Sequence, residues 1–206
     1  MARGASAMKV PHNIRRLFAA LVLLAGINAT AWADQFEDAG DAYKRGNYDR
    51  AFGLLKPLAE DGNADAQAIV GLMYALGQGV IQNSDEAVKW YRLAAEQGHA
   101  DAQFNLAVIY YLGAGVEPND KEASHWYGRA ADQGVAAAQY NLGYMFYKGH
   151  GVPRDYVQAY KWWSLAAAQN HEDAARNRDI AASKMTASQL EEAQRLVSDW
   201  LAAHPQ

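Results

Sequence analysis

Histidine is the residue of this sequence best suited to bind a metal ion or to transfer protons near neutral pH, because the chain contains no cysteine. The six histidines are His12, His99, His125, His150, His171 and His204. No two of them stand four residues apart and no H-E-x-x-H motif occurs, so the spacing that places two imidazoles on one helix face is missing. We therefore predict no metal site. The lack of cysteine also excludes disulfides, thiolate-bound metals and catalytic thiols.

Two other short motifs are similar to catalytic or nucleotide-binding signatures. Ser6 and Lys9 form an S-x-x-K pair, but they lie in a leader that we expect to be removed. G-x-G pairs begin at Gly77, Gly113 and Gly149, and each lacks the third glycine of a dinucleotide-binding loop. No G-x-S-x-G nucleophile motif occurs. We predict that the chain is not an enzyme and needs no cofactor.

The first 33 residues have the order of a secretory signal peptide. Four basic residues and no acidic residue occur here, and an apolar run follows over 17–27. Ala31 and Ala33 then form a small-x-small cleavage site, and Met8 is an alternative start. The apolar run is well short of the ~20 residues that span a bilayer. We expect cleavage after Ala33 and a periplasmic or secreted protein, with an uncleaved membrane anchor as the alternative.

The charge of the remaining chain argues against nucleic acid as a partner. The whole chain has 19 basic and 23 acidic residues, but four of the basic ones lie in the leader. Residues 34–206 therefore hold 15 basic and 23 acidic residues, a net charge of −8. No run of Lys or Arg provides the electrostatic footprint that a phosphate backbone requires.

Three consecutive blocks align without a gap, at 64–99, 100–135 and 136–171. The first two share half of their positions, which defines a 36-residue repeat. Within each block the spacing of small and apolar residues predicts a helix, and a glycine at Gly77, Gly113 or Gly149 ends it. An N-cap residue with Glu or Gln three positions later then predicts a capping box at the start of a second helix. These pairs are Asn83 and Glu86, Asn119 and Glu122, and Asp155 and Gln158.

A helix pair of this kind cannot bury its apolar face alone, so the blocks must stack. The blocks place Gly71, Ala107 or Gly143 where the two helices of one unit should approach most closely. Trp90, Trp126 and Trp162 are expected to fill the layers between units. We predict an all-α fold, a right-handed α-solenoid of antiparallel helix pairs.

The two ends of the array have weaker versions of the pattern. Residues 34–63 are expected to form a capping helix pair similar to a tetratricopeptide unit. Residues 172–206 are expected to form C-terminal capping helices, with Thr186 and Gln189 as a further capping box. The apolar stripe of this segment predicts a helix that closes the stack, and a partner-binding helix is the alternative. The stripe consists of Leu190, Ala193, Val197, Trp200 and Leu201.

The recurring pattern A-x-A-Q-x-x-L-G-x-x-Y-x-x-G-x-G-V, followed by A-x-x-W-Y-x-x-A-A-x-x-G, resembles the Sel-1-like repeat, a relative of the tetratricopeptide repeat. The resemblance covers 64–171 closely. Ala107, Trp163 and Asn170 depart from the pattern without affecting the fold. By resemblance, the first helix of each unit lines a concave face, and members of the family bind proteins there.

The concave face predicted in this way has tyrosines and asparagines in the second and third units. Tyrosine offers rigid contact area with a polar tip, and asparagine can hydrogen-bond a peptide backbone. Alternatively, Phe104 and Tyr140 pack between repeats and the asparagines are common to the family. The candidate partner-binding residues are Phe104, Asn105, Val108, Tyr111, Tyr140, Asn141, Tyr144 and Tyr147.

We therefore expect a protein-interaction module of the cell envelope, an adaptor or regulator that binds a peptide or protein segment. Binding of cell-wall material or another glycan through the aromatic surface is the first alternative. A hydrolase of the β-lactamase-like kind comes last, because that subgroup is cysteine-rich and this chain has no cysteine.

Overall fold

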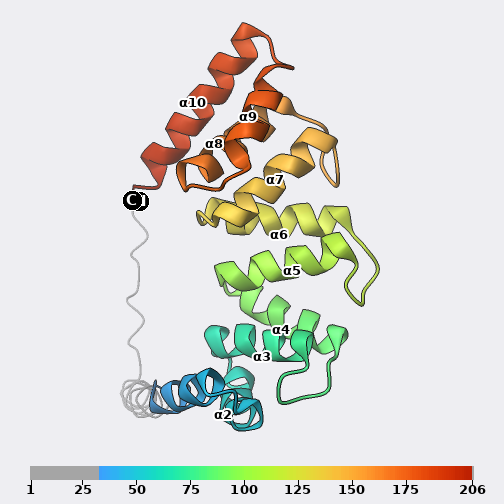
Figure 1. Cartoon of the computed structure of the whole chain (residues 1–206), viewed down its shortest axis with the longest axis vertical. Coiled ribbons are helices and arrows are strands. Elements are labelled where there is room, and N and C mark those ends of the chain that lie inside the picture. The colour runs from blue at the N-terminus through green and yellow to red at the C-terminus, as the bar shows by residue number, and fades with distance from the viewer. Residues whose placement is uncertain (1–32, 206) are drawn as a thin grey trace, which may run out of the picture.

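The computed structural model describes residues 33–205, and the expected signal peptide and its cleavage site lie almost entirely outside this range. The described chain is built from α-helices and has no strand. The predicted α-solenoid is confirmed: the helices stack in chain order along the long axis of the molecule (Figure 1). Helical residues 33–44 come first. They are followed by α2 (Tyr48–Glu60), α3 (Ala64–Leu76), α4 (Ser84–Glu96), α5 (Ala100–Leu112), α6 (Asp120–Asp132), α7 (Ala136–Lys148), α8 (Tyr156–Ala168), α9 (Ala174–Ala182) and α10 (Ala187–Ala203).

Glycines end the first helix of each unit as expected. Gly77, Gly113 and Gly149 adopt φ of 68°, 65° and 77°, the left-handed conformation that a side chain disfavours. The second glycine of each G-x-G pair lets the loop approach the preceding unit. A Cβ atom on Gly151 would lie 2.1 Å from the carbonyl oxygen of Asp120, the first residue of α6. The loop therefore ties each unit to the one before it.

The predicted capping boxes form only in part. Asn83, Asn119 and Asp155 accept hydrogen bonds from the third amide of the following helix, at 3.1, 3.1 and 3.0 Å. The carboxylates of Glu86 and Glu122 accept instead from the indole N–H groups of Trp90 and Trp126, at 3.0 and 3.1 Å. These indoles lie one helical turn later and are almost fully buried, so each needs an acceptor for its N–H.

Close approach within a unit also agrees with the prediction. A Cβ atom on Gly143 would lie 2.8 Å from the indole of Trp163, and one on Gly71 would lie 3.0 Å from the ring of Tyr91. Trp90, Trp126 and Trp162 are 4–5 % exposed and belong to the apolar clusters that join neighbouring units.

A ladder of buried glutamines links successive units. Each donates to a carbonyl at the end of the preceding unit, Gln67 to Ala59, Gln103 to Ala95 and Gln139 to Ala131, at 3.0, 3.0 and 3.2 Å. Each also accepts from a second glutamine that follows the second helix of its own unit. These donors are Gln97, Gln133 and Gln169, at 2.7, 2.8 and 3.0 Å. The Gln of the A-x-A-Q pattern is thus a polar core residue with its hydrogen bonds satisfied.

The C-terminal helix closes the stack. α10 packs against α8 and buries Ala193 and Trp200, while the Thr186 and Gln189 capping box forms as predicted. Leu201 does not belong to the buried stripe, because it is 42 % exposed, so that part of the prediction is wrong. A helix turns by about 100° per residue, and once Trp200 faces α8 its neighbour must turn away.

Candidate functional site

The eight candidate residues lie on α5 and α7, and all of them are half-buried. The structure places six of them in two pockets. Phe104 and Asn105 line a pocket of about 460 Å³. Its other lining residues include Phe36 of helical residues 33–44 and Asp65 of α3. A second pocket, of about 220 Å³, lies between the second and third units. We call this second one the tyrosine pocket; its lining residues are Tyr111, Tyr127, Tyr140, Asn141, Tyr144 and Met145.

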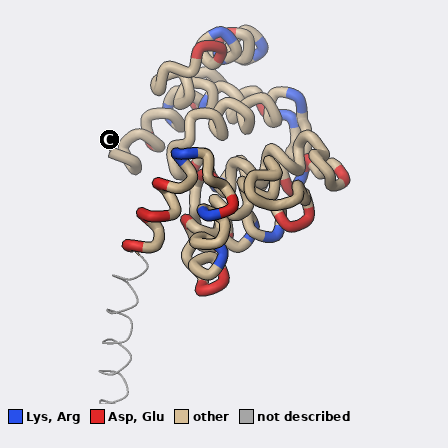
Figure 2. The backbone as a smooth tube through the Cα atoms, turned by 60° about the horizontal axis from the view of Figure 1, so that its bottom comes forward, with Lys and Arg blue, Asp and Glu red and all other residues tan. Residues whose placement is uncertain are grey.

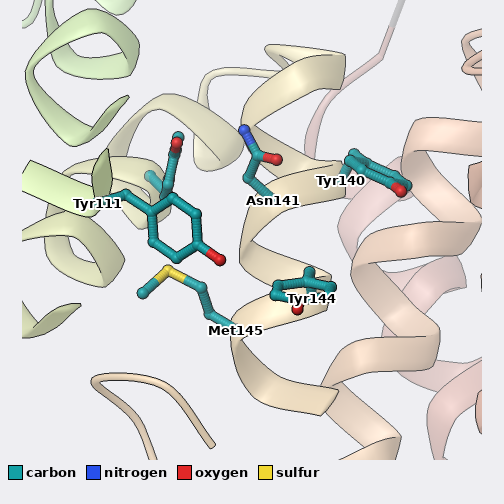
Figure 3. A pocket seen from close by; sticks show the side chains of 6 residues that line it. Tyr111, Tyr140, Asn141, Tyr144 and Met145 are labelled. Carbon is teal, nitrogen blue, oxygen red and sulfur yellow. The ribbon is translucent and has the colours of Figure 1, made fainter. Parts of the chain in front are cut away.

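The tyrosine pocket depends on two side chains from successive units. Tyr111, near the end of α5, and Tyr144, on α7, both line this pocket and lie on either side of it (Figure 3). Burial raises the pKa of Tyr111, and the neighbouring Tyr144 and Asp120 add to this shift. The Tyr111 hydroxyl is therefore neutral at physiological pH and can act as both donor and acceptor. One repeat earlier the same two positions hold Ala75 and Val108, so the aromatic pocket is specific to this junction.

The candidate asparagines have partners inside the protein. Asn105 faces the side chain of Tyr91, and Asn141 that of Tyr127. Both tyrosines are 2 % exposed, and burial, the larger effect, raises their pKa values, while each asparagine lowers the pKa of its tyrosine. Each asparagine thus lies beside a buried tyrosine, a position that its sequence pattern does not reveal. Asn177, one repeat further on, donates to the Tyr140 hydroxyl at 3.1 Å.

Two candidate aromatic rings are held by contacts within their own unit. Phe104 packs against Tyr127, with ring centroids 5.8 Å apart. Tyr140 stacks on His171, with ring centroids 4.2 Å apart and an angle of 14° between the ring planes. Both contacts lie within one unit, whereas the alternative expected these two rings to pack between repeats. Tyr140 is also among the residues that line the tyrosine pocket, although its ring points to the side of α7 away from Tyr111 (Figure 3).

The remaining two candidates do not line either pocket. Val108 packs on the main core cluster. The Tyr147 ring centroid lies 5.4 Å from that of Tyr156 and 5.5 Å from that of Trp163. Tyr147 thus packs on a separate apolar cluster near the C-terminus, which contains Trp163. Sequence reasoning missed Tyr127 and Met145, because Tyr127 belongs to a second helix and Met145 is buried in the core. A signal for Tyr127 existed: it stands 20 residues after Ala107, the same spacing as Gly71 to Tyr91.

The larger pocket near the N-terminus combines an apolar lining with acidic groups. Asp65 and Asp101 lie at its edge, and His99 Nε2 lies 3.3 Å from Asp65 Oδ1. His99 Nδ1 accepts the amide of Ala102 at 3.2 Å, so this imidazole caps α5. The backbone trace in Figure 2 shows further acidic positions along helical residues 33–44.

Neither pocket assembles a nucleophile with a base. Within residues 33–205, no group of three or more His, Asp or Glu side chains is placed to hold a metal ion. No helix in this same range is long and apolar enough to cross a membrane. The arrangement provides aromatic faces, neutral hydroxyls and apolar recesses, which are the means of binding a segment of another molecule.

Comparison with known proteins gives a consistent result. The family model of the Sel1 repeat matches residues 35–63, 64–99, 100–135 and 136–171. The first of these matches covers the segment expected to be a tetratricopeptide-like capping pair. A comparison with curated protein sequences finds no match.

Two solved structures are similar over most of this chain. One is c5321, a protective antigen present in uropathogenic Escherichia coli strains and displaying an SLR fold, with 36% identity and a TM-score of 0.73. The match covers 83% of this chain and 38% of that one. The other is a Sel1 repeat protein from Oxalobacter formigenes, with 35% identity and a TM-score of 0.66, covering 71% of this chain and 59% of that one. The chain therefore matches less than two thirds of the length of either relative.

Proposed function

This chain belongs to the Sel1 repeat family, and from that membership we propose that it is an adaptor that holds a segment of a partner protein in the tyrosine pocket. Sel1 repeat proteins generally mediate protein–protein interaction and are generally not enzymes. The observation that carries the proposal is that Tyr111 and Tyr144, from successive units, line one recess together with Tyr127.

The size and chemistry of the pocket support a peptide as the ligand. Its volume of about 220 Å³ is below the ~300–1,000 Å³ that is typical of small-molecule and cofactor sites. A space of this size suits one side chain of a longer segment. The hydroxyls of Tyr111 and Tyr144 can donate to and accept from the segment's backbone, so binding need not leave them unsatisfied.

The test is capture of partners by the chain that begins at Asp34. Envelope extract is passed over the immobilised protein, over the double variant Tyr111→Ala with Tyr144→Ala, and over Lys89→Ala as a control. Lys89 is 59% exposed and lies on α4, a second helix. We expect the double variant to lose at least tenfold of the captured protein and the control to lose none, with both variants remaining helical. Equal capture by all three would contradict the proposal, and retention of purified sacculi in place of protein would favour the glycan alternative.

We further propose a periplasmic location, which is supported by the leader and cleavage pattern of residues 1–33. Fractionation of cells expressing the full chain should place it in the periplasm with an N-terminus at Asp34. An intact leader in the membrane fraction would refute this.

A further inference from the structure

Where the second helices of successive units meet, three positions carry different residues from one junction to the next. At the junction between the second helices α4 and α6, the set consists of Arg92, Tyr110 and Glu122. Arg92 Nη2 donates to the Tyr110 hydroxyl and lies 3.8 Å from Glu122 Oε2. The long cation thus spans the space between the two helices.

The same positions at the preceding junction, between α2 and α4, also carry a cation, a tyrosine and a glutamate. These residues are Lys56, Tyr74 and Glu86. The Lys56 amine lies over the Trp90 ring, 4.8 Å from its centroid.

At the third junction, between α6 and α8, the cation, the tyrosine hydroxyl and the carboxylate are all absent. Gly128, Phe146 and Gln158 stand 36 residues after Arg92, Tyr110 and Glu122. The result is a pocket of about 520 Å³, which we call the Gly128 pocket. Its lining includes Gly128, Phe146 and Gln158 together with Lys121, Arg129 and Trp162.

Nothing in the fold requires glycine at position 128. A Cβ atom there would meet no atom within 4 Å, and the residue is not among those with positive φ. Glycine within a helix is unfavourable relative to alanine, so α6 is weakened without any gain in packing. What Gly128 provides is open space above Phe146 and Trp162.

The lining of this pocket has two cations that the preceding junction lacks at the same positions. Lys121 and Arg129 lie on α6 where the previous repeat has Asp85 and Leu93. On α8 the Lys161 amine lies over the Trp162 ring, 4.0 Å from its centroid.

A carboxylate is also lost at this junction. The glutamate that faces the cation one repeat earlier is here the neutral Gln158, and Asp132 is the acidic residue of the lining. An edge of positive charge on a body of net charge −8 selects an anionic partner.

We propose that the Gly128 pocket is a docking site for an acidic protein segment that inserts one aromatic or large aliphatic side chain into the space beside Gly128. The inserted side chain contacts Phe146 and Trp162, and acidic residues on either side of it pair with Lys121 and Arg129. This site is separate from the tyrosine pocket, so the chain can bind two segments at once.

The test measures binding of fluorescein-labelled heptapeptides to the chain that begins at Asp34, by fluorescence anisotropy at low salt. The probe is Ser-Glu-Asp-Phe-Glu-Asp-Ser. One comparison peptide replaces the Phe by Ala, and another replaces the four acidic residues by Lys. We expect the probe to bind at least tenfold more tightly than either peptide, because each of them loses one of the two contributions.

The pocket can be closed with the chemistry of the chain's own second junction. The double variant Gly128→Arg with Gln158→Glu restores the cation and the carboxylate that Arg92 and Glu122 provide there. We expect it to bind the probe at least tenfold more weakly. The matched control is Gly53→Arg, because Gly53 is an exposed glycine in α2 whose Cβ atom would also meet nothing within 4 Å.

Three results would each overturn the proposal: equal binding of the probe and the Ala peptide, unchanged binding by the double variant, or equal loss in the Gly53→Arg control. The Tyr111→Ala and Tyr144→Ala variant distinguishes the two pockets. It should bind the probe as the unchanged chain does, and loss of binding would place the probe in the tyrosine pocket and refute the Gly128 site.

Discussion

Replacement of Gln103 by methionine tests whether the glutamine ladder joins the units of the solenoid. Gln103 is completely buried, donates to the Ala95 carbonyl at 3.0 Å and accepts from Gln133 at 2.8 Å. Methionine has a similar length and flexibility but makes neither bond. The variant therefore removes two hydrogen bonds and leaves almost no cavity.

The expected cost follows from what the former partners retain. Ala95 still accepts the backbone N–H of Gly98 at 3.0 Å, and Gln133 still donates to the Gly98 carbonyl at 2.8 Å. Neither group is left without a partner, so each lost bond should cost about 1 kcal/mol and not the larger penalty of an unsatisfied buried group. We expect the free energy of unfolding to fall by about 2 kcal/mol, which lowers Tm by roughly 4–8 °C in a chain of this size.

The assay is urea and thermal unfolding followed by far-UV circular dichroism. Gln82→Met is the control, because the Gln82 amide donates to the Ala75 carbonyl at 2.8 Å at an exposed site. Its effect should stay within about 0.5 kcal/mol. If Gln103→Met unfolds at the same midpoint as Gln82→Met, the ladder does not stabilise the stack and the reasoning is refuted.

Four further predictions concern stability. Gly151→Ala should lower the free energy of unfolding by more than about 2 kcal/mol, because the residue has φ of 68° and its Cβ atom would lie 2.1 Å from the Asp120 carbonyl oxygen. Gly128→Ala should instead raise the free energy of unfolding by about 0.5–1 kcal/mol. If urea unfolding shows Gly151→Ala to be the more stable variant, both assignments are contradicted. Trp126→Ala should cost about 3–5 kcal/mol, and a melting temperature equal to that of the unchanged chain would show that Trp126 is not a core residue. Burial raises the pKa of Tyr127 above its ordinary value of 10.0, so its neutral form is favoured in the folded state. The contribution of Tyr127 to stability is therefore complete below about pH 10, and above that pH it falls by up to ~1.4 kcal/mol per pH unit. Tyr127→Phe should reduce the slope of the free energy of unfolding against pH in the alkaline range. An unchanged slope would exclude Tyr127 as its source.

The features that were predicted correctly from the sequence depend on neighbours along the chain. Gly77 ends a helix because its own backbone conformation is left-handed, and Asn83 caps one because its side chain reaches an amide three residues on. A period of 36 residues then repeats each local decision, so stacking follows from burial of the same face each time. The packing of Trp126 between units could be inferred for the same reason.

Side chains that had several partners within reach could not be assigned in this way. Glu122 was expected to complete a capping box, but a buried indole N–H on the same helix face competes for its carboxylate. Asn141 was expected to offer its amide to a ligand, but its side chain lies beside the buried Tyr127 of the preceding helix. Each choice depends on which buried polar group would otherwise lack a partner, and that is fixed by packing.

The sequence by itself determined the repeat, the helix boundaries, the all-α solenoid and a face rich in tyrosine. Only the tertiary structure decided that Tyr111 and Tyr144 share one pocket, that Tyr147 belongs elsewhere, and that Gly128 opens a second pocket. The physical reason is that helix formation and capping act over three to five residues of one chain segment, whereas a pocket forms where side chains from three or more helices fail to fill the space between them.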